Sequence, residues 1–260
     1  MHDIIIYGQD PRMESAARSF YHLGYEVFEN PDQNIEHSCV VVSPKLSAEE
    51  ERKLCSFLFA GQTLYYGILS PESLRQINEK GIFAISYLHL YDVVTENAKL
   101  TAKGILEIAK KDVVLKESHC LVLGYGHCGK AIAHALSLAG AHVDVAVRRK
   151  ELSAEIEGAH FGYVNIRQRE RQTFDTYSCV FNTVPALILD AKWLQCFSLS
   201  VRIYDIATSP GGTDFSYCKE HAISAGLFPG IPGKMYPEEA GRIIVSGIVE
   251  QETAINPPSE

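Results

Sequence analysis

A glycine-rich segment is the feature of this sequence that most directly suggests chemistry. It reads Gly124-Tyr125-Gly126-His127-Cys128-Gly129, with the spacing Gly-x-Gly-x-x-Gly. The apolar run Cys120–Leu123 precedes it, a helical pattern over Lys130–Ala139 follows, and a second strand-like run covers Ala141–Val147. In such a βαβ unit the glycines allow a tight turn, the approach of a pyrophosphate, and close helix packing. We therefore predict that these six residues bind a dinucleotide at a helix N-terminus.

The second strand-like run ends in Arg148-Arg149-Lys150, where an NAD-binding domain usually offers an acidic residue to the ribose hydroxyls. A guanidinium at this place can bind a 2′-phosphate through two parallel hydrogen bonds. NADP is therefore predicted in preference to NAD, with Arg148 and Arg149 as phosphate ligands. The alternative is that both arginines only begin a solvated helix. His127 is expected to be a neutral loop residue, because a helix N-terminus disfavours its charged form.

Two later strands end in turn residues. The run Tyr177–Phe181 leads into Asn182-Thr183-Val184-Pro185, and Arg202–Ile206 leads into Ala207-Thr208-Ser209-Pro210-Gly211-Gly212. A third turn is expected over Phe228–Lys234. Ligands of doubly wound sheets bind at the carboxyl ends of the strands, so these turns are predicted to form the floor of the site. The predicted cofactor contacts in them are Asn182, Thr183, Pro185, Ala207 and Ser209.

The elements around these motifs predict an α/β fold of two doubly wound lobes, because short β-branched runs alternate with helical patterns. The second lobe is expected to be a Rossmann dinucleotide-binding domain, and a C-terminal helix over Pro237–Glu250 is expected to return to the first lobe. The predicted domains are 1–97, an N-terminal lobe on the substrate or partner side, 98–235, the Rossmann domain, and 236–260, the helix with a loose tail at 256–260. In the first lobe we expect strands at Ile4–Tyr7, Tyr25–Phe28, Cys39–Val42, Thr63–Gly67 and Phe83–Tyr87, and helices at Pro11–Leu23, Ala48–Phe59 and Pro71–Lys80.

Composition excludes several classes of function. The chain has 260 residues and a formal net charge of −8, which argues against a nucleic-acid surface. No apolar run is long enough to cross a membrane. The seven cysteines are odd in number and lack a Cys-x-x-Cys pair, so we expect reduced thiols, no metal site and a cytoplasmic location.

Two further segments carry a resemblance to a known family. The stretches Asp205–Phe215 and Pro229–Lys234 resemble the A subunit of dipicolinate synthase, and Gly8-Gln9-Asp10-Pro11-Arg12 is similar to that family's opening turn. The resemblance implies an oxidoreductase that converts a cyclic hydroxy-tetrahydrodipicolinate of the lysine pathway into dipicolinate during sporulation. It also implies a nicotinamide cofactor and, as partner, the smaller, flavoprotein-like second subunit of dipicolinate synthase, and we expect a homo-oligomer. Lys103 and His127 stand where the family usually has Glu and often has Arg.

The implied reaction asks for two anion sites and a proton acceptor, because a dicarboxylate must be held against the nicotinamide. Arg12 and Lys234 are candidate carboxylate partners. Asp10 or Asp214 could act as base if burial raised its pKa, although Asp214 equally fits a helix start with Thr213 as cap. The alternatives are a non-catalytic dinucleotide-binding subunit, and a dehydrogenase of the alanine dehydrogenase type, because Asp205-Ile206-Ala207 also resembles those enzymes.

Overall fold

The chain forms two compact units. The computed structural model describes residues 3–30, 38–171 and 173–255. Unit 1 consists of Met1–Asn97 with Tyr236–Glu260, and unit 2 of Ala98–Met235. The boundary after Asn97 falls within helix α4 (Tyr91–Ala109). The tail expected at 256–260 lies outside the described residues, and the role given to the first lobe stays a prediction.

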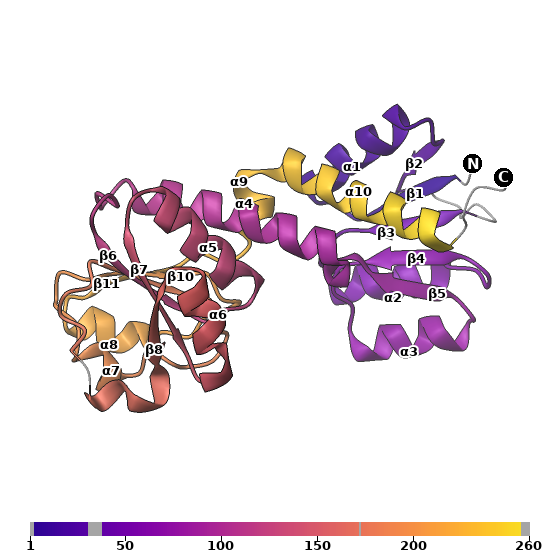
Figure 1. Ribbon diagram of the computed structural model, residues 1–260. Coiled ribbons are helices and arrows are strands. Elements are labelled where there is room, and N and C mark those ends of the chain that lie inside the picture. Colours follow the sequence, from indigo (N-terminus) through magenta and orange to yellow (C-terminus); the bar gives the residue numbers. More distant parts are fainter. Residues whose placement is uncertain (1–2, 31–37, 172, 256–260) are drawn as a thin grey trace. The chain divides into compact units, whose positions relative to one another are not determined.

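Unit 1 is built on a five-stranded parallel sheet in the order β2-β1-β3-β4-β5 (Figure 1). Its strands are β1 (Ile4–Tyr7), β2 (Val27–Glu29), β3 (Cys39–Val42), β4 (Thr63–Tyr66) and β5 (Phe83–Ser86). The order is that of a doubly wound sheet whose direction of winding reverses between β1 and β3. Strand β2 begins at Val27, two residues later than predicted.

Helices cover both sides of this sheet (Figure 1). They are α1 (Pro11–His22), α2 (Ala48–Phe57), α3 (Pro71–Glu79) and α10 (Pro237–Ile255), with a short 3₁₀ turn η1 (Tyr87–His89). Asp10, Ser47 and Ser70 cap the starts of α1, α2 and α3, because each side chain accepts a hydrogen bond from the first helical turn. One apolar core joins α1 and α10 to the sheet, and the other core lies on the opposite side with α2 and α3.

Helix α10 packs closely against α1. The Ser15 hydroxyl donates a hydrogen bond of 2.8 Å to the carbonyl of Glu238. Gly241 lies where an added Cβ would overlap the carbonyl oxygen of Arg12 and sit 2.7 Å from the Ser15 Cβ. The absence of a side chain at Gly241 therefore sets how closely the two helices approach.

Unit 2 is a six-stranded parallel sheet in the order β11-β10-β9-β6-β7-β8 (Figure 1). Its strands are β6 (His119–Leu123), β7 (His142–Val147), β8 (Gly162–Asn165), β9 (Cys179–Asn182), β10 (Arg202–Asp205) and β11 (Ser224–Leu227). This is the strand order of a dinucleotide-binding Rossmann sheet, with the switch point between β6 and β9. The predicted α/β class with two doubly wound sheets is therefore confirmed.

Unit 2 contains more helices than the sequence predicted, and the helix after the glycine motif begins earlier. They are α5 (His127–Leu138), α6 (Ser153–Gly158), α7 (Ala191–Leu194), α8 (Phe215–Glu220) and α9 (Ile231–Met235), with 3₁₀ turns η2 (Lys150–Leu152) and η3 (Ile166–Arg171). Helix α5 starts at His127 rather than Lys130, because Gly126 is its N-cap and the last three motif residues form the first turn. The turn expected over Phe228–Lys234 contains the short helix α9, so that expectation was wrong in part.

Among the described residues, none of the helices combines the length and the apolar character that crossing a membrane requires.

The Gly241 contact yields a stability prediction. Gly241→Ala should lower the free energy of unfolding by about 1–3 kcal/mol, since the new methyl group must displace the α1 backbone. The matched control is Gly158→Ala in α6, where a Cβ would meet no atom within 4 Å. The control should be neutral or more stable by up to about 1 kcal/mol, because alanine favours helix over glycine. Urea unfolding followed by circular dichroism measures both, and an unchanged midpoint for Gly241→Ala would contradict the packing argument.

Candidate functional site

The glycine motif forms the turn between β6 and α5. Gly124 has a φ of +94°, a conformation that favours glycine, and a Cβ there would lie 2.5 Å from the Thr183 hydroxyl. At Gly129 a Cβ would overlap the carbonyl oxygen of Gly124, so α5 can approach the turn only without a side chain. At Gly126 a Cβ would meet nothing within 4 Å. The motif thus leaves open space beside its middle glycine.

The first turn of α5 borders this space. Lys130 N–H donates the first helical hydrogen bond, 2.9 Å to the carbonyl of Gly126, so the N–H groups before it are not used within the helix. The helix has 12 residues and no acidic residue in its first turn. Its N-terminus therefore keeps the partial positive charge that attracts an anion. His127 is exposed there.

Cys128 is held within unit 2 by a contact with α4. Burial raises the pKa of its thiol, and a hydrogen bond with Thr101 lowers it by less, so the pKa stays above its ordinary value. A thiol of this kind is a weak nucleophile. The predicted contact of Cys128 with a cofactor stays a prediction. Thr101 comes from α4 and belongs to the segment Thr101-Ala102-Lys103-Gly104, but sequence reasoning did not predict its contact with Cys128.

A cavity of about 200 Å³ lies at the carboxyl edge of the sheet in unit 2. The predicted cofactor residues that line it are Gly124, Tyr125, Gly126, Arg148 and Arg149. Six apolar residues complete the lining: Ala146 and Val147 from β7, Val184 from the predicted turn after β9, and three that the sequence did not place at the site, Leu152, Ile166 and Ile188. Ile166 directly follows β8, a strand whose short run the sequence pattern did not reveal. The cavity therefore combines a polar side, formed by the glycine turn and the arginines, with an apolar wall.

Two cations border the cavity at the end of β7. Arg148 and Arg149 are both exposed, and neither guanidinium has a hydrogen bond or an ion pair with any residue in the described part of the chain. Lys130 differs, since its ammonium pairs with Glu155 and lies 5.1 Å from the centre of the Tyr125 ring. The two arginines are thus available to an anion.

The loop after β9 is fixed by hydrogen bonds to its own strand and to β6. The Thr183 hydroxyl donates to the carbonyl of Leu123 at 2.7 Å, across the switch point. Asn182 is fully buried; its amide donates to the Val184 carbonyl at 3.1 Å and accepts from the Val184 N–H at 3.0 Å. The Asn182 side chain, predicted to contact a cofactor, is therefore occupied in holding Val184. Pro185 is exposed beside it.

The loop after β10 contains Ala207, which is buried, and Ser209, which is exposed. Asp214 closes this loop as the N-cap of α8, accepting a hydrogen bond of 2.9 Å from the N–H of Tyr217. The cap was expected at Thr213, but the Thr213 hydroxyl donates to Asp205 instead. Lys234 is exposed on α9, within the same unit.

Asp10 and Arg12 belong to unit 1, where they pair with each other. The Arg12 Nε and Nη2 atoms donate to the two Asp10 carboxylate oxygens, each at 2.8 Å. Burial raises the pKa of Asp10, but the hydrogen bonds from Arg12 lower it by more, and the pKa lies below its ordinary value. The raised pKa that a base at Asp10 would need is therefore not found.

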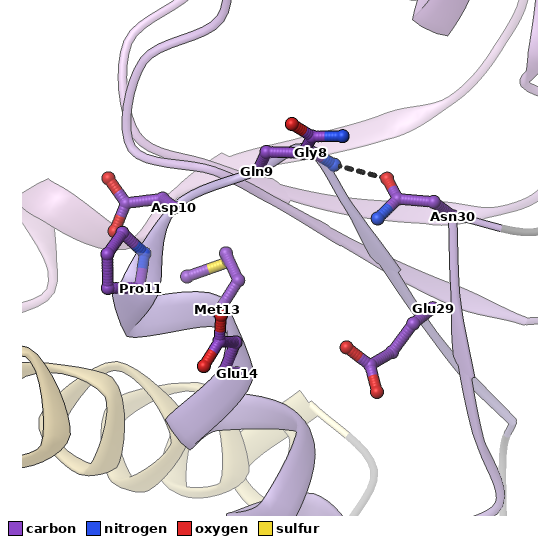
Figure 2. Close-up of a pocket in the computed structure, with 8 residues that line it drawn as sticks. All are labelled: Gly8, Gln9, Asp10, Pro11, Met13, Glu14, Glu29 and Asn30. Atoms are coloured by element: carbon purple, nitrogen blue, oxygen red, sulfur yellow. Dashed lines mark hydrogen bonds between the residues drawn. The ribbon is translucent and has the colours of Figure 1, made fainter.

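A second cavity, of about 320 Å³, lies beside this pair at the start of α1 (Figure 2). Gly8 donates its N–H to the Asn30 side chain at 2.7 Å, which joins the loops after β1 and β2. Three carboxylates line the cavity, from Asp10, Glu14 and Glu29. A lining of this charge repels a dicarboxylate, so the substrate expected near Arg12 does not fit this cavity.

Within the described residues, no cluster of three or more His, Cys, Asp or Glu side chains could hold a metal ion. All seven cysteines are free thiols.

Comparison with known proteins finds relatives both by sequence and by structure. No family model matches the sequence. The A subunit of dipicolinate synthase from Bacillus subtilis (strain 168) is 32% identical over 157 residues, 60% of this chain and 52% of that protein. The match therefore spans about half the length of the curated relative.

Solved structures extend the likeness to the whole fold. The A chain of dipicolinate synthase from Bacillus subtilis matches with a TM-score of 0.86 and 21% identity, covering 99% of this chain and 98% of that one. The A subunit of dipicolinate synthase from Bacillus halodurans matches with a TM-score of 0.83 and 22% identity, covering 96% and 97%.

Dehydrogenases share the fold at greater distance. An L-alanine dehydrogenase has a TM-score of 0.64 and 15% identity, over 98% of this chain and 90% of that one. A D-isomer-specific 2-hydroxyacid dehydrogenase from Lactobacillus delbrueckii, solved with NAD, has a TM-score of 0.62 and 12% identity, over 99% of this chain and 98% of that one. The resemblance indicated by the motifs is confirmed: this chain is similar to the A subunit of dipicolinate synthase in sequence over 157 residues and in fold over nearly its whole length.

Proposed function

We propose that this chain is the NADP-binding subunit of an oxidoreductase that forms dipicolinate from a cyclic hydroxy-tetrahydrodipicolinate. The observation that carries the proposal is the open space at Gly126, which meets the N-terminus of α5 at the switch point of a Rossmann sheet. The sequence similarity to the A subunit of dipicolinate synthase supports the choice of reaction.

The residues that line the cavity of unit 2 fit a dinucleotide. The Gly126 backbone and the first N–H groups of α5 would bind the pyrophosphate, because a side chain at position 126 would fill the space that the phosphates need. Leu152 and Ile166 offer an apolar wall suited to the adenine ring. The bound nicotinamide would supply the hydride acceptor for the oxidation, while the chain's own residues bind and orient it.

A 2′-phosphate on the adenosine ribose would find Arg148 and Arg149 at the end of β7. Both are exposed and without a partner among the described residues, and both line the cavity. An acid that would select NAD at this position is absent from the sequence. This supports NADP as the cofactor.

The substrate of this proposal is a dicarboxylate. In unit 2, the exposed Lys234 is a candidate partner for one carboxylate, and the exposed Ser209 lies in the loop after β10. In unit 1, Arg12 is paired with Asp10, so it would bind a substrate only by exchanging one carboxylate for another. The lowered pKa makes Asp10 a weak proton acceptor, and an orienting role for the pair agrees better with its geometry.

Further parts of the proposal rest on the similarity alone. A smaller, flavoprotein-like second subunit is the proposed partner, because the curated relative is by name one subunit of the synthase. A homo-oligomer and a cytoplasmic location stay predictions, the latter supported by seven free thiols.

A second candidate is a dinucleotide-binding subunit without catalytic activity of its own. The Asp10–Arg12 pair favours it, since the two side chains satisfy each other and leave neither a strong base nor a free cation there. An oxidoreductase of the alanine dehydrogenase type stays the third candidate, supported by the shared fold.

Gly126→Val tests the dinucleotide cleft. The valine side chain would occupy the open space beside the glycine without meeting protein atoms at its Cβ, so the fold should persist while binding is lost. Gly129→Ala is the contrast, because its Cβ overlaps the Gly124 carbonyl and should destabilise the fold. Circular dichroism and NADPH titration on the same samples measure the two effects. If a folded Gly126→Val variant still bound NADPH, the phosphates would not bind at this loop.

Arg148→Ala tests the choice between NADP and NAD. The wild type should bind NADPH more tightly than NADH, and the variant should narrow the difference by about 1–3 kcal/mol, as for a charge-assisted phosphate contact. Fluorescence titration with both reduced cofactors measures it. Arg202→Ala is the control, because Arg202 is an exposed arginine at the start of β10, at the amino edge of the same sheet. Equal affinities for the two cofactors in the wild type would contradict the assignment of NADP as the preferred cofactor.

Lys234→Ala tests the reaction itself. An assay would combine a lysine-pathway precursor, NADP and the companion subunit, following the ultraviolet absorbance of dipicolinate together with NADPH. Loss of a charge-assisted carboxylate contact should reduce substrate use by roughly 10- to 1,000-fold, with NADP affinity almost unchanged. A wild type that binds NADP but forms no dipicolinate supports the non-catalytic candidate. Normal turnover by the variant would show that Lys234 does not bind the substrate.

A further inference from the structure

Asp205 is a fully buried carboxylate whose hydrogen bonds to described residues go to the loop that follows it. It ends β10 and is 0% exposed. Its Oδ1 accepts from the Ala207 N–H at 3.0 Å, and its Oδ2 accepts from the Gly212 N–H and the Thr213 hydroxyl, both at 2.8 Å. Burying a carboxylate is costly unless donors surround it. Three donors from one loop therefore bind that loop to the strand end.

The neighbouring strand uses the same arrangement. Asn182 ends β9, is paired in register with Asp205, and is also 0% exposed. Its side chain holds both backbone groups of Val184, which lines the cofactor cavity. Two buried polar residues, side by side at the carboxyl edge, thus fix two separate loops.

The two loops meet at Gly212. Its carbonyl accepts hydrogen bonds from Ile188 N–H at 2.9 Å and Leu189 N–H at 3.0 Å, while its N–H donates to Asp205. A Cβ on Gly212 would overlap the Val184 carbonyl and lie 2.6 Å from the Asn182 amide nitrogen. Asp205 therefore aligns the loop after β10 directly, Asn182 holds Val184 directly, and Gly212 joins the two loops.

A Rossmann sheet binds one nucleotide on each half. Arg148 and Arg149 border the half formed by β6, β7 and β8, which places the adenosine there under the proposed function. The loop after β10 belongs to the other half, where the nicotinamide would lie under the proposed function. Asp205 holds this loop directly, whereas Ile188, which lines the cavity on the arginine side, is linked to it through the Gly212 carbonyl. The effect of Asp205 on a bound dinucleotide should therefore be larger at the nicotinamide end.

We propose that Asp205 is a positioning residue that holds the 207–213 loop in the geometry needed to bind and orient the nicotinamide half of the cofactor. The inference rests on the proposed function for the presence of the dinucleotide. Asp205 is fully buried, so it would act through the backbone of Ala207 and Gly212 and not by direct contact with the cofactor.

The test compares NADPH with 2′,5′-ADP, a fragment that has the adenosine half and no nicotinamide. Asp205→Asn replaces one carboxylate oxygen with an amide N–H₂, which cannot accept a hydrogen bond from the donors that it would face, so the loop should shift. The Kd of NADPH should rise about tenfold, and the change in nicotinamide fluorescence on binding should be lost, while the Kd of 2′,5′-ADP stays within about twofold. Thr213→Val removes one of the three donors and should give a smaller change in the same direction, which keeps the test informative if Asp205→Asn does not fold.

The outcomes separate the inference from the proposed function. Weaker NADPH binding with unchanged 2′,5′-ADP binding, in either variant, supports the positioning role, because a general loss of stability would weaken both ligands alike. Equal weakening of both ligands, or no weakening in folded variants, overturns the inference while the proposed cofactor stands. A wild type that binds neither ligand overturns the proposed cofactor and this inference together.

Discussion

The contact between Gly129 and the carbonyl of Gly124 is the constraint on which the cleft of unit 2 depends. It lets α5 begin directly against the end of β6, with Gly124 turned to a positive φ and no Cβ at either position. Because the helix starts there, the N–H groups of its first turn, which have no acceptor within the helix, border the space beside Gly126. A side chain at Gly129 would move the helix away and remove the anion-binding end from the switch point.

Buried polar residues then determine the shape of the loops around that cleft. Asn182 and Asp205 end adjacent strands, and each uses its side chain to bind backbone groups of the segment that follows. A loop held in this way needs few side chains of its own, which agrees with the glycine and proline content of 207–213. The same hydrogen bonds satisfy polar groups that would otherwise be costly to bury.

Charge is distributed differently in the two units. In unit 2 the cations Arg148 and Arg149 are exposed beside a cavity and have no partner in the described chain, so an anion can bind them. In unit 1 Arg12 and Asp10 neutralise each other, and the cavity beside them is also lined by the carboxylates of Glu14 and Glu29. The electrostatic support for an anionic ligand is therefore found in unit 2 rather than at the opening turn of the chain.

The sequence alone determined the fold class, the glycine turn and the cations after β7, because these depend on local patterns: strand–turn–helix spacing and residue type at a strand end. The tertiary structure alone decided how the polar candidates are used. The Asn182 side chain, a predicted cofactor contact, holds Val184. Asp10 was one of two candidate bases on the condition that burial raised its pKa, and its pKa is lowered. The Thr213 hydroxyl bonds Asp205, and Asp214 caps α8. A side chain's partner and burial depend on residues distant in sequence, and residue type and spacing do not specify those neighbours. Ile166 and Ile188 line the cavity, and the sequence did not predict this for the same reason: folding brings separate segments to one edge of the sheet.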